Sequence, residues 1–168
     1  TSDKYGCVTM DNYEIGRNVG RHFIKKGCYH TGVLTHDTSF PIMRMWMKGF
    51  LDVFAEAGHP IAAEDIILCN TSSASAVEVC EDLYRRGKMP QALFCESDVL
   101  AHGVLYACHN LGLIIPNDLE VFTIGITMPE LNDFAIPSLS RIDIPMGLIG
   151  EECMRLITAL IEKKKTRS

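Results

Sequence analysis

The chain has 168 residues, of which 47% are hydrophobic and 22% are charged, and its formal net charge is −5 at pH 7. This composition is typical of one globular domain with a substantial core. The acidic balance excludes duplex-DNA binding by this chain alone, because such binders present a basic face. No apolar run reaches the roughly 20 residues that span a bilayer. We interpret the one basic run as a solvated end rather than a nucleic-acid contact: Lys163, Lys164, Lys165 and Arg167.

Strand-like and helical segments alternate along most of the chain. The pattern predicts strands over residues 5–9, 31–35, 66–69, 92–95 and 120–124. Between them it predicts helices over residues 13–26, 42–57, 74–86 and 99–111. The apolar residues of the second helix fall on one stripe, which is typical of an amphipathic helix: Met43, Met47, Phe50, Leu51 and Phe54.

Glycines mark the predicted helix ends. Gly27, Gly58, Gly87 and Gly112 can each adopt the left-handed conformation that ends a helix. Asp98 can cap the helix that begins at residue 99. Alternating units of this kind indicate an α/β fold with an open parallel sheet of about five or six strands and helices on both faces.

The last third of the chain changes character. Residues 127–137 show no clear period, and a strand-like run follows over residues 138–144. An amphipathic helix then begins near residue 146, and no further strand follows it. We therefore expect this helix to cover a sheet that lies outside this chain.

The seven cysteines are odd in number, and no two of them have C-x-x-C spacing. Scattered free thiols suit a reducing compartment, so we expect a cytoplasmic protein. No signal peptide opens the sequence. The start at Thr1, without Met, is typical of an excised segment.

Signatures for a catalytic serine, a phosphate-binding loop, a zinc peptidase or a dinucleotide are absent from the sequence. His102 and His109 lie seven residues apart, whereas a metal pair on one helix needs a spacing of about three or four. Cys95 ends an apolar strand beside Glu96, and a neighbouring carboxylate weakens a thiol as a nucleophile. We expect no enzyme activity, no metal and no cofactor.

Polar residues gather where the predicted strands end. Because the carboxyl ends of parallel strands meet at one edge, these residues predict a rim suited to a polyhydroxylated or amide ligand. The alternative is that they are caps and turn residues. The rim comprises Asp11, Asn12, His36, Asp37, Asn70, Thr71, Ser72, Glu96, Ser97, Asp98 and Thr127.

Trp46 is the single tryptophan and lies in the first half of the second predicted helix. An indole ring can stack on a sugar, with an apolar face and a polar N–H. The alternative, which the sequence leaves open, is that Trp46 anchors the core.

Five stretches together resemble the lactose-repressor family of transcriptional regulators. They match the family in order and at its spacing over nearly the whole chain, and the stretch from Leu111 to Gly125 is the most recognisable. The five stretches are residues 8–17, 25–34, 87–105, 111–125 and 136–150.

This resemblance implies the type I fold of periplasmic binding proteins, in which two lobes joined by three crossovers hold an effector between them. Residues 1–142 would form the C-terminal lobe, and residues 143–168 would form a helix of the other lobe plus a charged tail. The DNA-binding domain would be absent from this chain. The expected partners are a small-molecule effector such as a sugar, operator DNA through a missing helix-turn-helix, and a second copy in a homodimer.

The resemblance implies which residues bind the effector, but this chain differs from the family at several of those positions. Ser97 stands where the family usually has Asn, Trp46 stands where it has an effector-gripping Arg, and Thr127 stands where it has an acid; Arg44 is the nearest guanidinium. The expected ligand-binding residues are His36, Asp37, Arg44, Trp46, Thr71, Ser97, Asp98 and Thr127. The expected dimer residues are His102, Leu105, Tyr106 and His109.

Two other functions remain open. A sugar-binding protein of an ABC-type uptake system would share the fold but come from a secreted precursor, and unpaired cysteines argue against it. A small α/β enzyme would need a nucleophile and a base within hydrogen-bond reach at the strand ends.

Overall fold

The computed structural model describes residues 6–36, 40–126 and 129–165. The chain divides into two compact units, one over Asn12–Asp143 and one formed by Thr1–Asp11 together with Ile144–Ser168. The larger unit holds the whole sheet, and the smaller unit holds the last helix.

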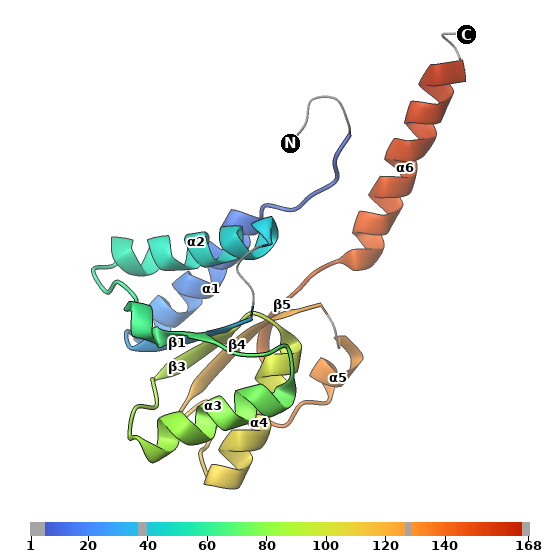
Figure 1. The fold of residues 1–168 in the computed structure, drawn as a ribbon. Coiled ribbons are helices and arrows are strands. Elements are labelled where there is room, and N and C mark those ends of the chain that lie inside the picture. The colour runs from blue at the N-terminus through green and yellow to red at the C-terminus, as the bar shows by residue number, and fades with distance from the viewer. Residues whose placement is uncertain (1–5, 37–39, 127–128, 166–168) are drawn as a thin grey trace. The chain divides into compact units, whose positions relative to one another are not determined.

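A five-stranded parallel sheet lies at the centre of the larger unit (Figure 1). Its order is β2-β1-β3-β4-β5, and every neighbouring pair is parallel. Leu34 of β1 lies beside Cys95 of β3. The predicted fold class, an open parallel α/β sheet, is confirmed. The strands are β1 (Thr31–Thr35), β2 (Ile66–Leu68), β3 (Ala92–Cys95), β4 (Glu120–Gly125) and β5 (Ser140–Asp143).

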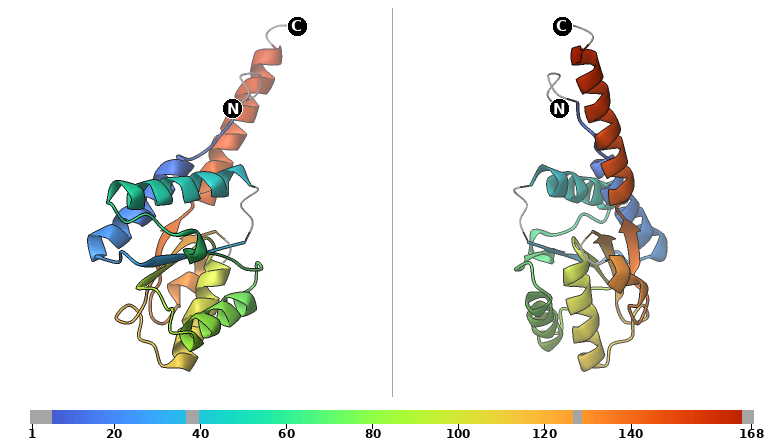
Figure 2. Two further views of the ribbon diagram at one scale, coloured as in Figure 1. Left: turned by 60° about the vertical axis from the view of Figure 1, so that its left-hand side comes forward. Right: turned by 90° about the vertical axis from the view of Figure 1, so that its right-hand side faces the viewer.

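Helices cover both faces of this sheet. One face carries α1 (Asn12–Lys26) and α2 (Pro41–Glu56), and the other carries α3 (Ser73–Arg85) and α4 (Asp98–Leu111), as both views of Figure 2 show. The short 3-10 helix η1 (Ala63–Asp65) precedes β2, and α5 (Pro129–Asp133) follows β4. As predicted, glycines with positive φ follow the ends of α1 to α4: Gly27, Gly58, Gly87 and Gly112.

The core under α1 and α2 is aromatic. Phe50 of α2 lies 5.0 Å from Phe94 of β3 and 6.2 Å from Phe23 of α1, measured between ring centroids. Phe122 of β4 contacts Phe23 at 6.1 Å. Ring pairs in tilted or edge-to-face geometry contribute about 0.5–1.5 kcal/mol each beyond the area that they bury.

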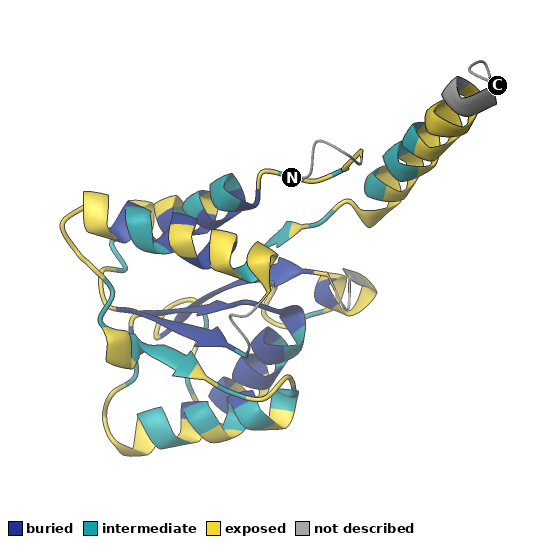
Figure 3. Cartoon of the chain, turned by 45° about the horizontal axis from the view of Figure 1, so that its top comes forward, coloured by how far each residue is buried: buried dark blue, intermediate teal, exposed yellow. Residues whose placement is uncertain are grey.

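The opposite face of the sheet has an aliphatic core. Successive strand residues point to opposite faces, so Leu93 and Cys95 join the cluster that contains Cys80 of α3 and Val104 of α4. Figure 3 shows the inner strands as fully buried, whereas the edge strand β2 is half-buried. This burial explains the continuous apolar run of β3, because inner parallel strands are covered on both faces.

Two glycines allow α1 and α2 to approach closely. A Cβ atom on Gly16 would overlap the backbone of Trp46, and one on Gly49 would overlap the backbone of Tyr13. The two helix backbones are therefore in contact where these glycines lie.

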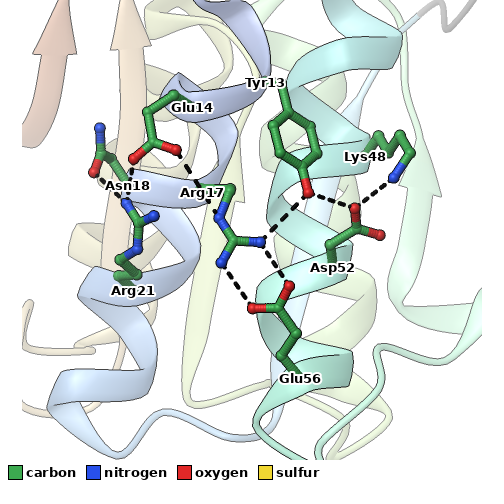
Figure 4. A network of polar contacts seen from close by, with 8 residues as sticks. All are labelled: Tyr13, Glu14, Arg17, Asn18, Arg21, Lys48, Asp52 and Glu56. Atoms are coloured by element: carbon green, nitrogen blue, oxygen red, sulfur yellow. Dashed lines mark hydrogen bonds and ion pairs between the residues drawn. The ribbon is translucent and has the colours of Figure 1, made fainter.

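A polar network joins the outer sides of α1 and α2 (Figure 4). Arg17 donates two hydrogen bonds to the carboxylate of Glu56, both at 2.7 Å, and the Tyr13 hydroxyl donates to Asp52 at 2.7 Å. Arg17 thereby lowers the pKa of Glu56, and hydrogen bonds from Lys48 and then Tyr13 lower that of Asp52. Because solvent screens these groups, we assign the network an orienting role rather than a large stabilising one.

The structure differs from the predicted elements in three places. Residues 6–9 form no strand, because no neighbouring strand is available to pair with them within the described residues. Pro129–Asp133 form α5 in the stretch without periodicity, since five residues are too few to show one. Ser97, rather than Asp98, occupies the N-cap position of α4, and Asp98 is the first helical residue.

The smaller unit contains α6 (Met146–Lys165), so the amphipathic helix predicted near residue 146 is present. Within this unit the side chain of Leu156 lies close to Gly6. None of the helices in the part of the chain that the structure describes is long and apolar enough to cross a membrane. Several apolar side chains of α6 are exposed: Met146, Leu148, Met154, Ile157, Leu160 and Ile161.

Candidate functional site

The candidate site is centred on the carboxyl ends of β1 and β3. The chain runs from β1 to its neighbour β2 and then crosses to β3 on the other side of β1. The winding direction therefore reverses between β1 and β3. In open parallel sheets, ligands bind beyond the carboxyl ends at such a switch point. His36 follows β1 there, and Glu96, Ser97 and Asp98 follow β3. The sheet therefore brings these four predicted rim residues to adjoining strand ends.

Glu96 is a buried carboxylic acid at this edge, with 1% of its surface exposed. Its Oε2 accepts a short hydrogen bond from the Thr35 hydroxyl, and the backbone N–H of His36 also donates to the carboxylate. Burial raises the pKa of Glu96 to about 7, although both hydrogen bonds oppose the rise by favouring the ionised form. Glu96 can therefore change its charge near neutral pH.

Three buried polar atoms at these strand ends have no hydrogen-bond partner among the described residues. They are Nδ1 of His36, Oε1 of Glu96 and Oγ of Ser97. Ser97 occupies the N-cap position of α4, but its side chain makes no capping hydrogen bond. Buried polar groups are nearly always paired, so these three unpaired groups make this edge the candidate ligand-binding surface.

Asp98 is fully buried and belongs to a hydrogen-bonded chain that leads away from the sheet edge. Its Oδ2 accepts from Nδ2 of Asn132 at 3.1 Å, and Oδ1 of Asn132 lies 2.9 Å from Nε2 of His102. Asn132 is also buried. The chain of contacts connects the candidate ligand edge to the predicted dimer face on α4.

Other predicted ligand residues lie on nearby loops and helix starts. Thr71 is exposed between β2 and α3. The neighbouring Ser72 caps α3 by accepting a hydrogen bond from Ser75 N–H at 3.2 Å, which bears out the alternative of a helix cap for that rim residue. Arg44 is exposed in the first turn of α2. Asp37 and Thr127 lie outside the described residues.

Trp46 favours the core alternative. It is 3% exposed, and its indole Nε1–H donates to Oδ1 of Asn12 at 3.0 Å. The ring is thus covered between α1 and α2, and its polar atom is satisfied within the helix pair. Asn12, which the sequence placed on the rim, is the first residue of α1 and is itself buried.

The predicted dimer face of α4 borders an apolar hollow of about 510 Å³. Tyr106 is 61% exposed beside it, and residues around α5 add Phe134 at 80% and Ile136 at 92%. The other predicted members, His102, Leu105 and His109, line the same hollow. Large exposed side chains gathered in this way are typical of a protein interface.

A larger hollow, of about 900 Å³, lies at the opposite, amino-terminal edge of the sheet. His30 and Pro90, which precede β1 and β3, line it together with charged residues of α3 such as Asp82. Volume alone favours this hollow, but its position does not, because ligands of open parallel sheets sit at the carboxyl edge. We therefore place the site with the unpaired buried groups.

At the candidate site, the structure pairs the Thr35 hydroxyl with the Glu96 carboxylate, which the sequence did not reveal. Thr35 is 0% exposed, so its hydroxyl is not available to attack a substrate. Cys95 is also fully buried, and burial raises its pKa well above the usual range, as expected for a core thiol. Among the described residues, His, Cys, Asp and Glu form no group of three that could hold a metal ion.

Thr35 and Asn132 were missed by sequence reasoning for different reasons. Thr35 reads as an ordinary residue of a buried strand, and Asn132 lies in the stretch without periodicity. The signal for Thr35 was its position as the last residue of the predicted strand. Asn132 carried no comparable signal.

The open parallel sheet with helices on both faces is the fold of periplasmic-binding-protein-like domains. Residues 21–168 match the family described as periplasmic binding protein-like domain, and the chain belongs to this family. The resemblance to lactose-repressor-type regulators is confirmed by the curated relatives and solved structures that are similar to it, which are transcription regulators and not enzymes.

Catabolite control protein A of Priestia megaterium is 32% identical to the chain over 169 residues, covering 100% of this chain and 50% of that protein. The transcriptional repressor PurR of Actinobacillus pleuropneumoniae serotype 3 is 28% identical and covers 99% of this chain and 49% of that protein. The chain thus spans about half the length of the curated relatives that it matches.

The solved structure of a LacI-family transcription regulator from Clostridium acetobutylicum superposes with a TM-score of 0.92 at 29% identity. The superposition covers 98% of this chain and 61% of the Clostridium acetobutylicum chain. A sugar-binding LacI-family regulator from Escherichia coli, solved with phosphate, has a TM-score of 0.77 at 27% identity, with 89% of this chain and 54% of that chain covered.

Proposed function

We propose that this chain is the effector-sensing part of a cytoplasmic transcription regulator of the LacI type. The effector is a small molecule that binds at the carboxyl edge of the sheet and is released chemically unchanged. The observation that carries the proposal is the set of unpaired buried polar atoms at the β1–β3 switch point, in a chain whose relatives are repressors.

The proposed binding surface follows the strand ends. Asp98 and Ser97 are supplied by the start of α4, His36 by the end of β1 and Arg44 by the start of α2. Trp46 is left out because its ring is buried between helices. The proposed ligand-binding residues are His36, Asp37, Arg44, Thr71, Ser97, Asp98 and Thr127.

Residues 1–142 belong, in this proposal, to the C-terminal lobe of a two-lobed effector domain, and residues 143–168 belong to the other lobe. The two compact units divide between Asp143 and Ile144, which supports the proposed boundary between the lobes at residues 142–143. Residues 6–11 group with α6 instead of with the sheet. In this proposal they form the crossover that leads into the C-terminal lobe. The exposed apolar side chains of α6 support a role in covering part of the second lobe.

Operator DNA would be bound by a helix-turn-helix elsewhere in the parent protein. Effector binding between the lobes would favour one of two lobe arrangements and so change the spacing of two DNA-binding heads in a homodimer. The apolar face around Tyr106, Phe134 and Ile136 supports self-association through α4 and α5. Symmetric pairing of one patch with itself is the usual solution for such dimers.

A thermal-shift screen of the full-length parent against a panel of metabolites tests the proposal, because a ligand of the folded state raises the melting temperature. We expect at least one metabolite to raise it, and we expect Asp98→Asn to remove the rise. Asp82→Asn, at the opposite edge of the sheet, is the matched control and should retain it. Loss of the rise in Asp82→Asn with retention in Asp98→Asn would contradict the proposed edge.

A further inference from the structure

The buried carboxyl group of Glu96 points to the chemical class of the effector, an inference that rests on the proposed function. Cys95 and Leu34 are register partners, so Glu96 and Thr35 follow them at the ends of two adjoining strands. One carboxylate oxygen is held by Thr35, and the other has no partner among the described residues. Glu96 is 1% exposed, so its unpaired carboxylate oxygen is a strong hydrogen-bond acceptor in a protected position.

Glu96 is one of two buried acids at this point, and the other titratable groups nearby are few. The titratable groups on the elements that meet there are His36 after β1, Cys69 after β2 and Asp98 at the start of α4. The charge of Glu96 contributes to raising the pKa of the Cys69 thiol, behind the larger effect of burial, which places that thiol within electrostatic reach. Asp98 is the first residue of α4, two residues after Glu96, and is a second buried acid.

We propose that Glu96 selects the effector by accepting a hydrogen bond from a hydroxyl or amine of a small molecule that carries no negative charge. A hydroxyl or amine of the ligand can donate a hydrogen bond to the unpaired oxygen of Glu96. A ligand carboxylate or phosphate in the same position has no hydrogen to donate and lies beside two acidic side chains, Glu96 and Asp98. The N-terminus of α4 would by itself favour an anion. Glu96 supplies negative charge there when it is ionised, and this charge opposes that preference.

The same geometry makes recognition of a donor sensitive to pH. The hydrogen bonds from Thr35 and His36 N–H favour the ionised carboxylate, and a ligand donor favours it further. Since the pKa of Glu96 is about 7, binding of a neutral donor strengthens as the pH rises through neutrality. If only the ionised form binds, affinity increases by about tenfold between about pH 6 and about pH 8.

Titration of the 168-residue chain, followed by amide chemical shifts, tests this inference with three matched probes. D-glucose is neutral, D-glucosamine carries an amine, and D-gluconate is an anion. We expect the first two to shift the amide signals of His36, Glu96 and Ser97, with dissociation constants in the millimolar range, and we expect D-gluconate to leave them unchanged. D-glucose affinity should rise about tenfold from about pH 6 to about pH 8.

Glu96→Gln keeps the size and hydrogen-bonding oxygen of the side chain but removes its charge. It should flatten the pH profile of D-glucose binding and weaken discrimination against D-gluconate, while Asp98 remains in place. Thr35→Val, which removes the donor that favours the carboxylate, should move the midpoint of the profile to higher pH. Glu120→Gln alters another buried carboxyl at the amino end of β4 and should bind the probes like the wild-type chain.

The inference is overturned if D-gluconate binds as well as D-glucose, or if Glu96→Gln keeps the wild-type pH profile. If the amide signals of Thr71 and Asp98 still shift with D-glucose in either outcome, the carboxyl edge remains the binding surface and only the role of Glu96 is lost. Absence of shifts with all three probes also overturns the inference. The metabolite screen of the parent then decides separately whether the chain senses an effector.

Discussion

Two buried glutamates at opposite ends of the sheet respond to burial in opposite ways. Glu96, at the carboxyl edge, is held by Thr35 and one backbone N–H, and its pKa rises to about 7. Glu120, where β4 begins, accepts from Lys26 at 2.8 Å and lies 2.9 Å from Nε2 of His22. Burial would raise the pKa of Glu120 too, but these two side chains lower it below its usual value. Glu120 has hydrogen-bond partners for both carboxylate oxygens, whereas one oxygen of Glu96 has no partner among the described residues.

Glu96 makes the stability of the chain fall as the pH rises. Its folded-state pKa of about 7 exceeds the ordinary value of 4.5, so ionisation above pH 4.5 favours the unfolded chain until the pH passes about 7. A rise of this size corresponds to roughly 3 kcal/mol. We expect urea denaturation to show that Glu96→Gln is more stable than the wild-type chain at about pH 8 by up to roughly 3 kcal/mol, with little difference at about pH 4. An equal pH dependence in both proteins would show that Glu96 is not buried as described.

Glu120 should have the opposite effect on stability. Because its pKa is lowered in the folded state, its contribution is present above pH 4.5 and is lost as the pH falls through the folded-state pKa. Glu120→Gln should lower the free energy of unfolding at neutral pH by about 1 kcal/mol, a modest value because Lys26 is partly exposed. Denaturation at neutral and acidic pH measures this, and a loss that persists at low pH would argue against ionic pairing.

Helix elements depend on close backbone contact as well as on apolar stripes. Gly16 lies where α1 meets the Trp46 backbone, so Gly16→Ala should lower the free energy of unfolding by about 1–3 kcal/mol through overpacking. Gly147→Ala is the matched control: an added Cβ at Gly147 of α6 meets no atom within 4 Å. Calorimetry or urea denaturation compares the two. A Gly16→Ala variant as stable as the control would contradict the close approach of α1 and α2.

The sequence predicted most elements because their periods and stops are local. The bounds of β1 and β3 agree with the structure, and Gly112 ends α4 with φ of 71°. Contacts between distant segments were not predictable in the same way. The pairing of Asn132 with Asp98 spans 34 residues, and that of Trp46 with Asn12 also spans 34. Such pairs depend on how helices pack, which no single stretch of sequence encodes.

The candidate site was predicted by topology rather than by motif. Parallel strands necessarily bring His36 and Ser97 to one edge, so the rim followed once the strands were identified. Which rim residues are caps and which are unpaired was not predictable, because Ser72 and Ser97 have the same chemistry and both hold N-cap positions. Only Ser72 makes the capping hydrogen bond with its side chain.

At the scale of the whole molecule, the apolar face of α4 and α5 should mediate self-association. Ile136 is 92% exposed and Phe134 80%, so replacing both with Ser removes apolar area without opening the core. We expect the double variant to weaken dimerisation by at least about tenfold, since buried apolar side chains dominate interface energies. Sedimentation velocity over a concentration series measures this. Leu68→Ser, at an exposed position on the edge strand, is the control.

If the Phe134 and Ile136 double variant dimerises like the wild-type chain, the dimer interface does not include this face. Weakening by Leu68→Ser alone would place it on the β2 edge of the sheet. The face around Tyr106 is supported only if the first variant dissociates and the second does not.

Amide hydrogen exchange of the parent protein, with and without the metabolite that raises its melting temperature most, tests the effector edge most directly. Slower exchange is expected at the ends of β1 and β3, in peptides that contain His36 and Glu96–Asp98. Protection confined to the opposite edge, around Asp82–Pro90, would contradict the assignment and place the effector in the larger hollow there.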